Sequence, residues 1–310
     1  MPQSTNQILK YTVTTIPVGI FVYFIFRFHK DFYLISDIST SQFIQLLFLS
    51  LLTITLNGSK LNQIIKSFGI DIRMKEWFGL SSITLTLNSV LFKAGSLVTS
   101  NYLKRKHGFH YMSYVGALGA DQLIALLIST LVGLCASVYL AVQMGRDLDL
   151  LIGGLVLVCA ALIFLLNWKF TFTGKKENFF KALNRAVEAL KNIVRDRRLF
   201  VIICAHALGM ILLTAIRFYI VCRVLHYDIS LIQCFLFTTV MIFVRAFPLI
   251  QSDLGTRELA LGLLAEFLGS GLQSGMMAAF VDRLVVLFWC LITAALFRNT
   301  LIDREDSLKT

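Results

Sequence analysis

The chain has 310 residues, of which 57% are hydrophobic and only 15% are charged. Soluble domains carry about 25% charged residues, so the composition excludes an ordinary soluble protein and predicts an integral membrane protein. The formal net charge of +11 does not indicate nucleic-acid binding. Most of the cations stand beside the ends of apolar runs, where they meet anionic lipid and fix orientation.

The apolar runs predict an all-α fold with seven to eight transmembrane helices, in a single polytopic membrane domain over residues 1–310. A helix that crosses a bilayer needs about 20 apolar residues. Such spans are expected at roughly 11–28, 43–57, 113–142, 148–166, 199–225, 230–247 and 275–297.

Two further stretches, 77–103 and 257–268, are apolar but interrupted by polar or helix-breaking residues. Irregular backbone at membrane depth survives only where protein or a wet cavity satisfies its polar groups. We therefore expect both stretches to be re-entrant or broken helices.

The loop cations predict the orientation of the chain. Most of them lie near the N-terminus and in the loops 58–76, 104–106 and 167–198, whereas the loops on the opposite side hold few. Because loops rich in Lys and Arg stay in the cytoplasm, the N-terminus is expected there and the protein in the inner membrane. The tail is charge-balanced and leaves the side of the C-terminus open.

The loop 167–198 contains apolar residues at helical spacing with Lys and Arg between them, namely Phe180, Leu183, Val187, Leu190 and Val194. This pattern predicts a basic amphipathic helix. Two interpretations stay open: the helix lies on the inner leaflet of the membrane, or it packs on its own protein.

An internal repeat emerges when the sequence is shifted by 161 residues, which pairs Gly108 with Gly269 and Asp121 with Asp282. Halves of about 1–142 and 199–297 then each contain a broken helix, a short connection and a helix with an acid. Many transporters build a substrate site between such halves. Whether the halves are parallel or inverted stays open at this point.

Polar and charged residues inside apolar segments are the candidate site, because each buried charge costs about 2.5–3.5 kcal/mol on insertion scales and needs a partner or a function. We expect them to line a cavity for a lipid head group, although a closed salt-bridge network is the alternative. The candidates are Asn88, Lys93, Asp121, Arg217, Arg245, Asp253, Arg257, Glu258, Asp282 and Arg283.

The stretch "FPLIQSDLGTRE" predicts the start of a half-helix inside the membrane. Pro248 stops the preceding helix, Asp253 stands where an N-cap would begin the next one, and Gly255 permits a close backbone approach. Free amides at that helix start attract a phosphate, and Arg257 can bind the same group through two hydrogen bonds.

No enzymatic activity is expected. The sequence has no P-loop, no metal-ligand spacing and no nucleophile with an evident base, so neither a cofactor nor a metal is predicted. The six cysteines lie in or at the ends of apolar spans without a C-x-x-C pair, which indicates small core residues.

Two motifs resemble those of the lysylphosphatidylglycerol synthase transmembrane (flippase-like) family. "FPLIQSDLGTRELALGLLAEFLG" followed by "AAFVDRL" matches the second motif at Pro248, Gly255, Arg257, Glu258, Gly269 and Arg283. "LNSVLFKAGSLVTSNYLKRKHG" resembles the first motif through Asn88, the turn residue Gly95 and "KRKHG". It departs where the family usually has Pro, Arg and an acid, because this chain has Phe92, Ala94 and Ser96.

The resemblance implies an all-helical membrane protein that moves lipids between leaflets. Fused members of the family carry an aminoacyl-phospholipid made by a cytoplasmic synthase domain, and stand-alone members are associated with polyprenyl-linked and other envelope lipids. The implied partners are membrane lipids and a separate lipid- or glycan-modifying enzyme. A membrane subunit of a transferase, or a scaffold for one, is the alternative function.

Overall fold

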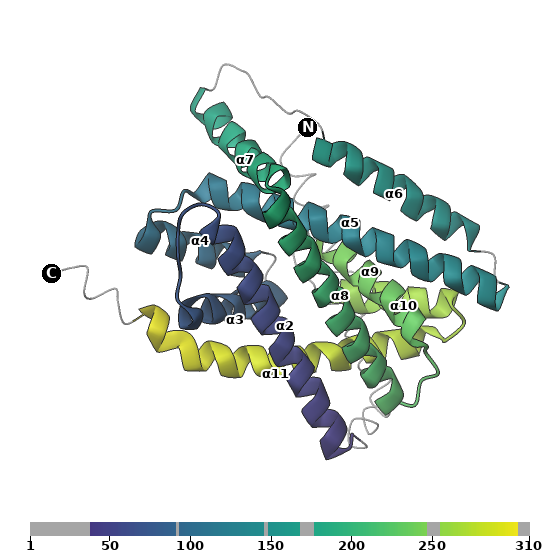
Figure 1. Ribbon diagram of the computed structural model, residues 1–310. Helices are drawn as coiled ribbons and strands as arrows, with labels where there is room; N and C mark the ends of the chain where they lie inside the picture. Colours follow the sequence, from purple (N-terminus) through teal and green to yellow (C-terminus); the bar gives the residue numbers. More distant parts are fainter. Residues whose placement is uncertain (1–37, 91–92, 146–147, 168–176, 247–254, 303–310) are drawn as a thin grey trace, which may run out of the picture.

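The computed structural model describes residues 38–90, 93–145, 148–167, 177–246 and 255–302, and every regular element in these ranges is an α-helix (Figure 1). Among the described residues, five helices are long and apolar enough to cross a bilayer, and the span predicted at 11–28 lies outside these residues. The five helices are α2 (Thr40–Lys66), α5 (Tyr111–Met144), α6 (Asp149–Asn167), α8 (Arg197–Val224) and α11 (Leu272–Ile302). The structure confirms the predicted class, an all-α membrane protein.

Four shorter helices form two broken segments. α3 (Met74–Val90) is followed by α4 (Ala94–His107), and α9 (Leu231–Ala246) is followed by α10 (Thr256–Phe267). The sequence predicted a full span at 230–247, but α9 has 16 residues. At 1.5 Å per residue such a helix is about 24 Å long, shorter than the hydrocarbon core of about 30 Å. α9 is therefore one arm of a broken segment.

The helices recur at the offset of 161 residues that separates Tyr111, the start of α5, from Leu272, the start of α11. At this offset α2, α3, α4 and α5 correspond to α8, α9, α10 and α11. The turn that ends each short second arm also recurs, because Gly108 and Gly269 have φ angles of 66° and 78°. Glycine adopts such angles without steric cost. The correspondence supports two related halves.

The two halves run in opposite directions, as the pairing of α2 with α8 shows. Along α8, His206 Nε2 lies 3.4 Å from Ser59 Oγ, and further on Arg217 Nη1 lies 3.2 Å from Thr53 Oγ1. Residue numbers rise on α8 as they fall on α2, so the helices are antiparallel (Figure 1). This antiparallel packing of two corresponding helices favours an inverted repeat over a parallel one, a choice that the sequence left open.

Each half packs its first short arm against the last helix of the other half. α3 packs on α11 and, equivalently, α9 packs on α5. In the second pair Thr239 Oγ1 donates a hydrogen bond to the carbonyl oxygen of Ser129, at 3.1 Å. A Cβ at Gly133 would lie 2.8 Å from Thr239 Oγ1, so the glycine permits this close approach. The halves are thus interlocked rather than side by side.

Two helices lie between the halves in sequence. α7 (Glu177–Arg195) packs on α5 and buries Ala186, Ala189 and Ile193, which favours the packed interpretation of the amphipathic loop. α6 buries only Leu155 and Leu162 among its described side chains. It therefore presents most of its apolar surface outward, as a helix in contact with lipid does.

Candidate functional site

A cluster of charges lies where α8, α10 and α11 meet, and Asp282 of α11 is its centre. Arg217 of α8 donates from Nε to Asp282 Oδ1 at 2.5 Å and from Nη2 to Oδ2 at 3.3 Å. Arg257 of α10 donates from Nη2 to the same Oδ2. One carboxylate therefore accepts hydrogen bonds from two guanidinium groups, of which Arg217 binds it through both oxygens.

A second ion pair lies one residue further along both helices. Glu258 of α10 accepts a hydrogen bond from the amide of Gly255 at 2.9 Å, through Oε2. Its other oxygen, Oε1, lies 2.9 Å from Nε of Arg283 on α11. Consecutive residues of α10 thus bind consecutive residues of α11. Glu258 also satisfies an amide that the helix start leaves free.

The five charged residues are buried, with exposed fractions between 0% for Asp282 and Glu258 and 5% for Arg283. Three of them are cationic and two are acidic, so this set carries one positive charge in excess. Buried charges are costly unless they are paired and hydrogen-bonded. An anionic group that bound beside these guanidinium groups would balance the excess charge.

The first half has a simpler counterpart. Asp121, which corresponds to Asp282, lies on α5, and its Oδ2 accepts a hydrogen bond from Lys60 Nζ of α2 at 2.8 Å. Both side chains are partly exposed, 16% for Asp121 and 12% for Lys60. In both halves, therefore, an acid on the last helix binds a cation on the first helix.

Asn88 and Gly95 hold the break between α3 and α4 together. Asn88 Oδ1 accepts a hydrogen bond from the amide of Gly95 at 2.9 Å and one from Ser96 at 3.4 Å. A Cβ at Gly95 would collide with the backbone of Thr84, so only glycine allows the two arms to lie this close. Asn88 thus satisfies amides at the break, as backbone at membrane depth requires.

The remaining predicted site residues lie beside the two helix breaks. Lys93 is exposed at the break, with a left-handed φ of 55°. Arg245 is exposed near the end of α9. Gly255, with a φ of 80°, begins α10 as the turn prediction requires. Pro248 and Asp253 lie outside the described residues.

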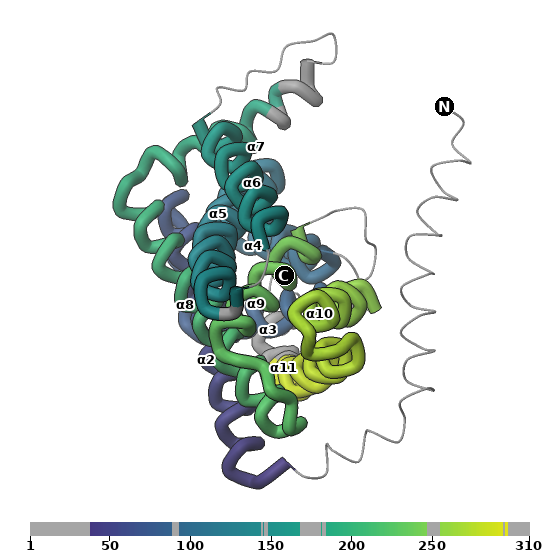
Figure 2. The backbone as a smooth tube through the Cα atoms, turned by 90° about the vertical axis from the view of Figure 1, so that its right-hand side faces the viewer, coloured from purple at the N-terminus to yellow at the C-terminus, as the bar shows by residue number. Residues whose placement is uncertain are grey.

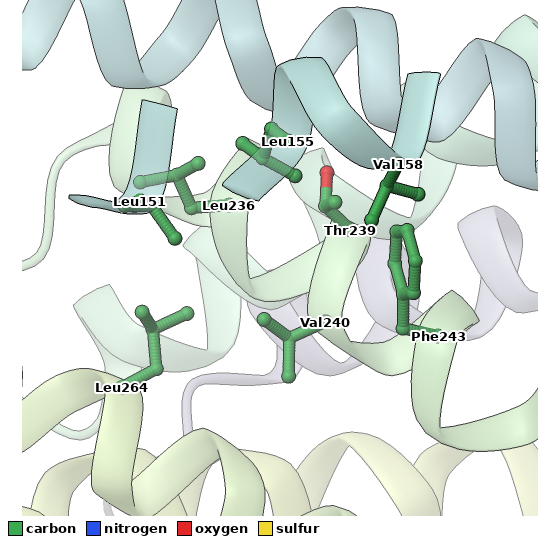
Figure 3. Close-up of a pocket in the computed structure, with 8 residues that line it drawn as sticks. All are labelled: Leu151, Leu155, Val158, Leu236, Thr239, Val240, Phe243 and Leu264. Carbon is green, nitrogen blue, oxygen red and sulfur yellow. The ribbon is translucent and has the colours of Figure 1, made fainter. Parts of the chain in front are cut away.

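An apolar cavity of about 150 Å³ lies between α6, α9 and α10 (Figure 3). Thr239 contributes the one hydroxyl of its lining, and that hydroxyl donates to backbone carbonyls. The cavity is therefore suited to hydrocarbon and not to a head group. Its lining consists of Leu151, Leu155, Val158, Leu236, Thr239, Val240, Phe243 and Leu264. Among the described residues, no group of three or more acids, histidines or cysteines could hold a metal ion.

Comparison with protein families gives a match over residues 7–294 to the family described as the lysylphosphatidylglycerol synthase TM region. The chain belongs to this family. Comparison with curated proteins and with solved structures gave no significant match.

The second motif of the lysylphosphatidylglycerol synthase transmembrane family is where the buried charge cluster forms. Arg257, Glu258 and Arg283 belong to that motif, and all three make ion pairs in the structure. The first motif departs from the family pattern at Ser96, which corresponds to Arg257 at the offset of 161 residues. The first half accordingly binds its acid through α2 alone.

Lys60 and Thr53 are polar partners that the sequence analysis missed. The span predicted from the sequence ends near residue 57 and leaves Lys60 among the loop cations, whereas α2 continues to Lys66. The apolar spacing of Leu61, Ile64 and Ile65 is a helical signal that extends the span past Lys60.

Proposed function

We propose that the protein moves a phosphate-bearing lipid between the leaflets of the membrane. The observation that carries this proposal is the position of Arg257, a buried guanidinium in the first turn of a half-helix inside the membrane. A guanidinium at a helix start combines two features that bind phosphate, a bidentate donor and free amides. Membership of a lipid-related transmembrane family supports the same function.

The head group would bind between the two halves, while its tails stay in the bilayer. Arg257 would donate to the phosphate, Arg217 would hold Asp282, and the acids would balance the remaining charge or accept a cationic substituent. The apolar cavity of about 150 Å³, lined by α6, α9 and α10, would accommodate part of a tail. The substrate class comprises phospholipids, aminoacyl-phospholipids and polyprenyl-linked lipids.

The proposed orientation follows from the cations. The end of α4, with Lys104, Arg105 and Lys106, and the start of α8, with Arg197 and Arg198, would face the cytoplasm. With inverted halves, the turn between α10 and α11 would lie on the opposite side. In this arrangement α3 and α4 enter the membrane from the cytoplasm, and α9 and α10 enter from outside.

The test uses purified protein in vesicles of phosphatidylethanolamine and phosphatidylglycerol that contain a head-group-labelled phosphatidylglycerol. We expect the labelled lipid of the inner leaflet to become accessible to a membrane-impermeant quencher, with no change in lipid mass. Protein-free vesicles provide the background rate. A lipid product of altered mass would support the transferase alternative, and accessibility at the background rate would contradict the proposal for this substrate.

A further inference from the structure

The two halves match at most interfaces, and one interface shows the largest difference between them. α2 meets α3 much as α8 meets α9, and α3 packs on α11 as α9 packs on α5. In contrast, α10 lies along α11 (Figure 2), whereas α4 has only a small contact with α5. We refer to these two interfaces as the α10–α11 seam and the α4–α5 seam.

The α10–α11 seam is closed by small residues and by the ion pairs. A Cβ at Gly262 would lie 2.5 Å from Cγ of Met276, and one at Gly275 would collide with the backbone of Leu261. Such glycines allow two helix backbones to approach closely inside a membrane. Toward the start of α10, the Arg257–Asp282 and Glu258–Arg283 pairs complete the contact.

The α4–α5 seam is open, as shown by the exposure of the residues that correspond to buried residues of the α10–α11 seam. Glu258 is 0% exposed and Met276 is 1% exposed, but their counterparts Leu97 and Val115 are 54% and 38% exposed. The buried face of α10 thus corresponds to an exposed face of α4. The same contrast separates buried Gly262 and Ala265 from their exposed counterparts, Asn101 and Lys104.

We infer that α4 and α10 are the two gates of an alternating-access cycle, and that the structure is the state with α10 closed and α4 open. This inference rests on the proposed transport function and identifies the two helices that move during transport. Inverted halves can exchange conformations, which opens the site to the opposite side of the membrane. In the exchanged state α4 lies along α5, and α10 leaves α11.

The charges couple this exchange to the head group. When α10 leaves α11, Arg257 loses Asp282, while Asp282 keeps both hydrogen bonds from Arg217. The guanidinium of Arg257 then lacks the carboxylate that balanced its charge, so the phosphate of the head group takes the place of that carboxylate. In the other half, closure brings Ser96 to Asp121, since these residues correspond to Arg257 and Asp282. A hydroxyl and a carboxylate are compatible partners there.

Paired cysteines at equivalent positions test the two gates. One variant combines Asn101→Cys with Val115→Cys across the α4–α5 seam, and the other combines Gly262→Cys with Met276→Cys across the α10–α11 seam. Both are made in a background in which the native cysteines are replaced, namely Cys135, Cys159, Cys204, Cys222, Cys234 and Cys290. Copper phenanthroline, which catalyses the oxidation of two neighbouring thiols to a disulfide by dissolved oxygen, is applied to the full chain in vesicles, and crosslinking and lipid accessibility are followed together.

We expect the pair at 262 and 276 to crosslink rapidly and the pair at 101 and 115 to crosslink more slowly, as the rarer closed state of α4 is visited. Each completed crosslink should reduce flipping to the rate of protein-free vesicles. The single variants Asn101→Cys, Val115→Cys and Met276→Cys, treated with the same reagent, should retain flipping. Because Asn101 and Val115 are both exposed, their variant does not depend on tolerance of a larger residue at Gly262.

Two results would overturn the inference: a protein that flips lipid although residues 101 and 115 never crosslink, or one that still flips after either crosslink is complete. A third result separates the gates from the lipid. If both pairs crosslink but the untreated protein flips no labelled lipid, the gates exist and the proposed substrate is wrong.

Discussion

Asp282 organises the interior of the second half. Its two oxygens accept hydrogen bonds from Arg217 and Arg257, which come from different helices, and the residue has no exposed surface. A buried ion pair adds little net stability by itself, but removing one partner leaves an uncompensated charge in a medium of low dielectric constant. Asp282 therefore determines whether two buried guanidinium groups are tolerated.

The substitution Asp282→Asn is expected to lower the free energy of unfolding by about 3–5 kcal/mol, because both guanidinium groups lose their carboxylate. Thermal unfolding in detergent, followed by size-exclusion chromatography, measures the change. Asp149→Asn is the matched control, since Asp149 is exposed in the first turn of α6. Equal melting temperatures for the two variants would show that Asp282 does not stabilise the cluster.

At the scale of elements, the two broken helices depend on contacts that only small residues permit. Gly95 lets α4 approach the backbone of Thr84, and Gly262 and Gly275 let α10 approach α11. The amides released at each break are bound by side chains, Asn88 in the first half and Glu258 in the second. Each break is thus stabilised by a side chain that binds the free amides of the interrupted backbone.

Gly95→Ala tests the contact between α3 and α4. The added methyl group would collide with the Thr84 backbone, and overpacking of this kind costs about 1–3 kcal/mol. Gly153→Ala is the control, because a Cβ at Gly153 would meet nothing within 4 Å. We expect a lower melting temperature for the first variant only. An unchanged melting temperature for both would mean that the arms do not approach as closely as described.

A polar cluster where α3 begins and α4 ends should respond to pH. Glu76, in the first turn of α3 and outside the five long helices, binds His107 at 2.7 Å and Lys106 at 2.9 Å. Burial alone would raise the pKa of Glu76, but the hydrogen bonds from His107 and Lys106 outweigh it and hold the pKa below its usual 4.5. A carboxylate with a lowered pKa stabilises the folded state above its unfolded pKa and stops doing so as the pH falls through the folded value.

We therefore expect Glu76→Gln to melt at a lower temperature than the wild type. This difference should be largest at about pH 7 and should decrease once the pH falls below about 4.5. Melting curves of both proteins over this range measure it. A difference that is independent of pH would show that the charge of Glu76 does not join α3 to α4.

At the scale of the whole molecule, the two halves carry the same kind of charge pair on corresponding helices. α2 and α8 lie antiparallel, and each half contributes an acid on its last helix and a cation on its first. Asp121 with Lys60 and Asp282 with Arg217 are the two versions of this arrangement. The second version is larger because α10 adds Arg257 and, one residue further on, the Glu258–Arg283 pair.

Much of this arrangement was predictable from local sequence. Polar residues and glycines inside apolar stretches predicted the broken helices, and the matching acids Asp121 and Asp282 predicted related halves. The partners of these acids were not predictable, because Lys60 and Arg217 meet them only through helix packing. The relative orientation of the two halves was not predictable from the sequence either, because it depends on whether a 16-residue helix such as α9 crosses the membrane or turns back.

The measurement that tests the central proposal most directly compares lipid flipping by Arg257→Gln and Arg223→Ala in vesicles. Both variants remove one guanidinium, but Arg257 is buried in the cluster, whereas Arg223 is exposed near the end of α8. In Arg257→Gln, Asp282 keeps Arg217 as its partner, so the protein should still elute as a folded species. We predict that Arg257→Gln flips head-group-labelled phosphatidylglycerol at the rate of protein-free vesicles, and Arg223→Ala at the wild-type rate. Wild-type flipping by folded Arg257→Gln would contradict the proposal that this cluster binds the lipid phosphate.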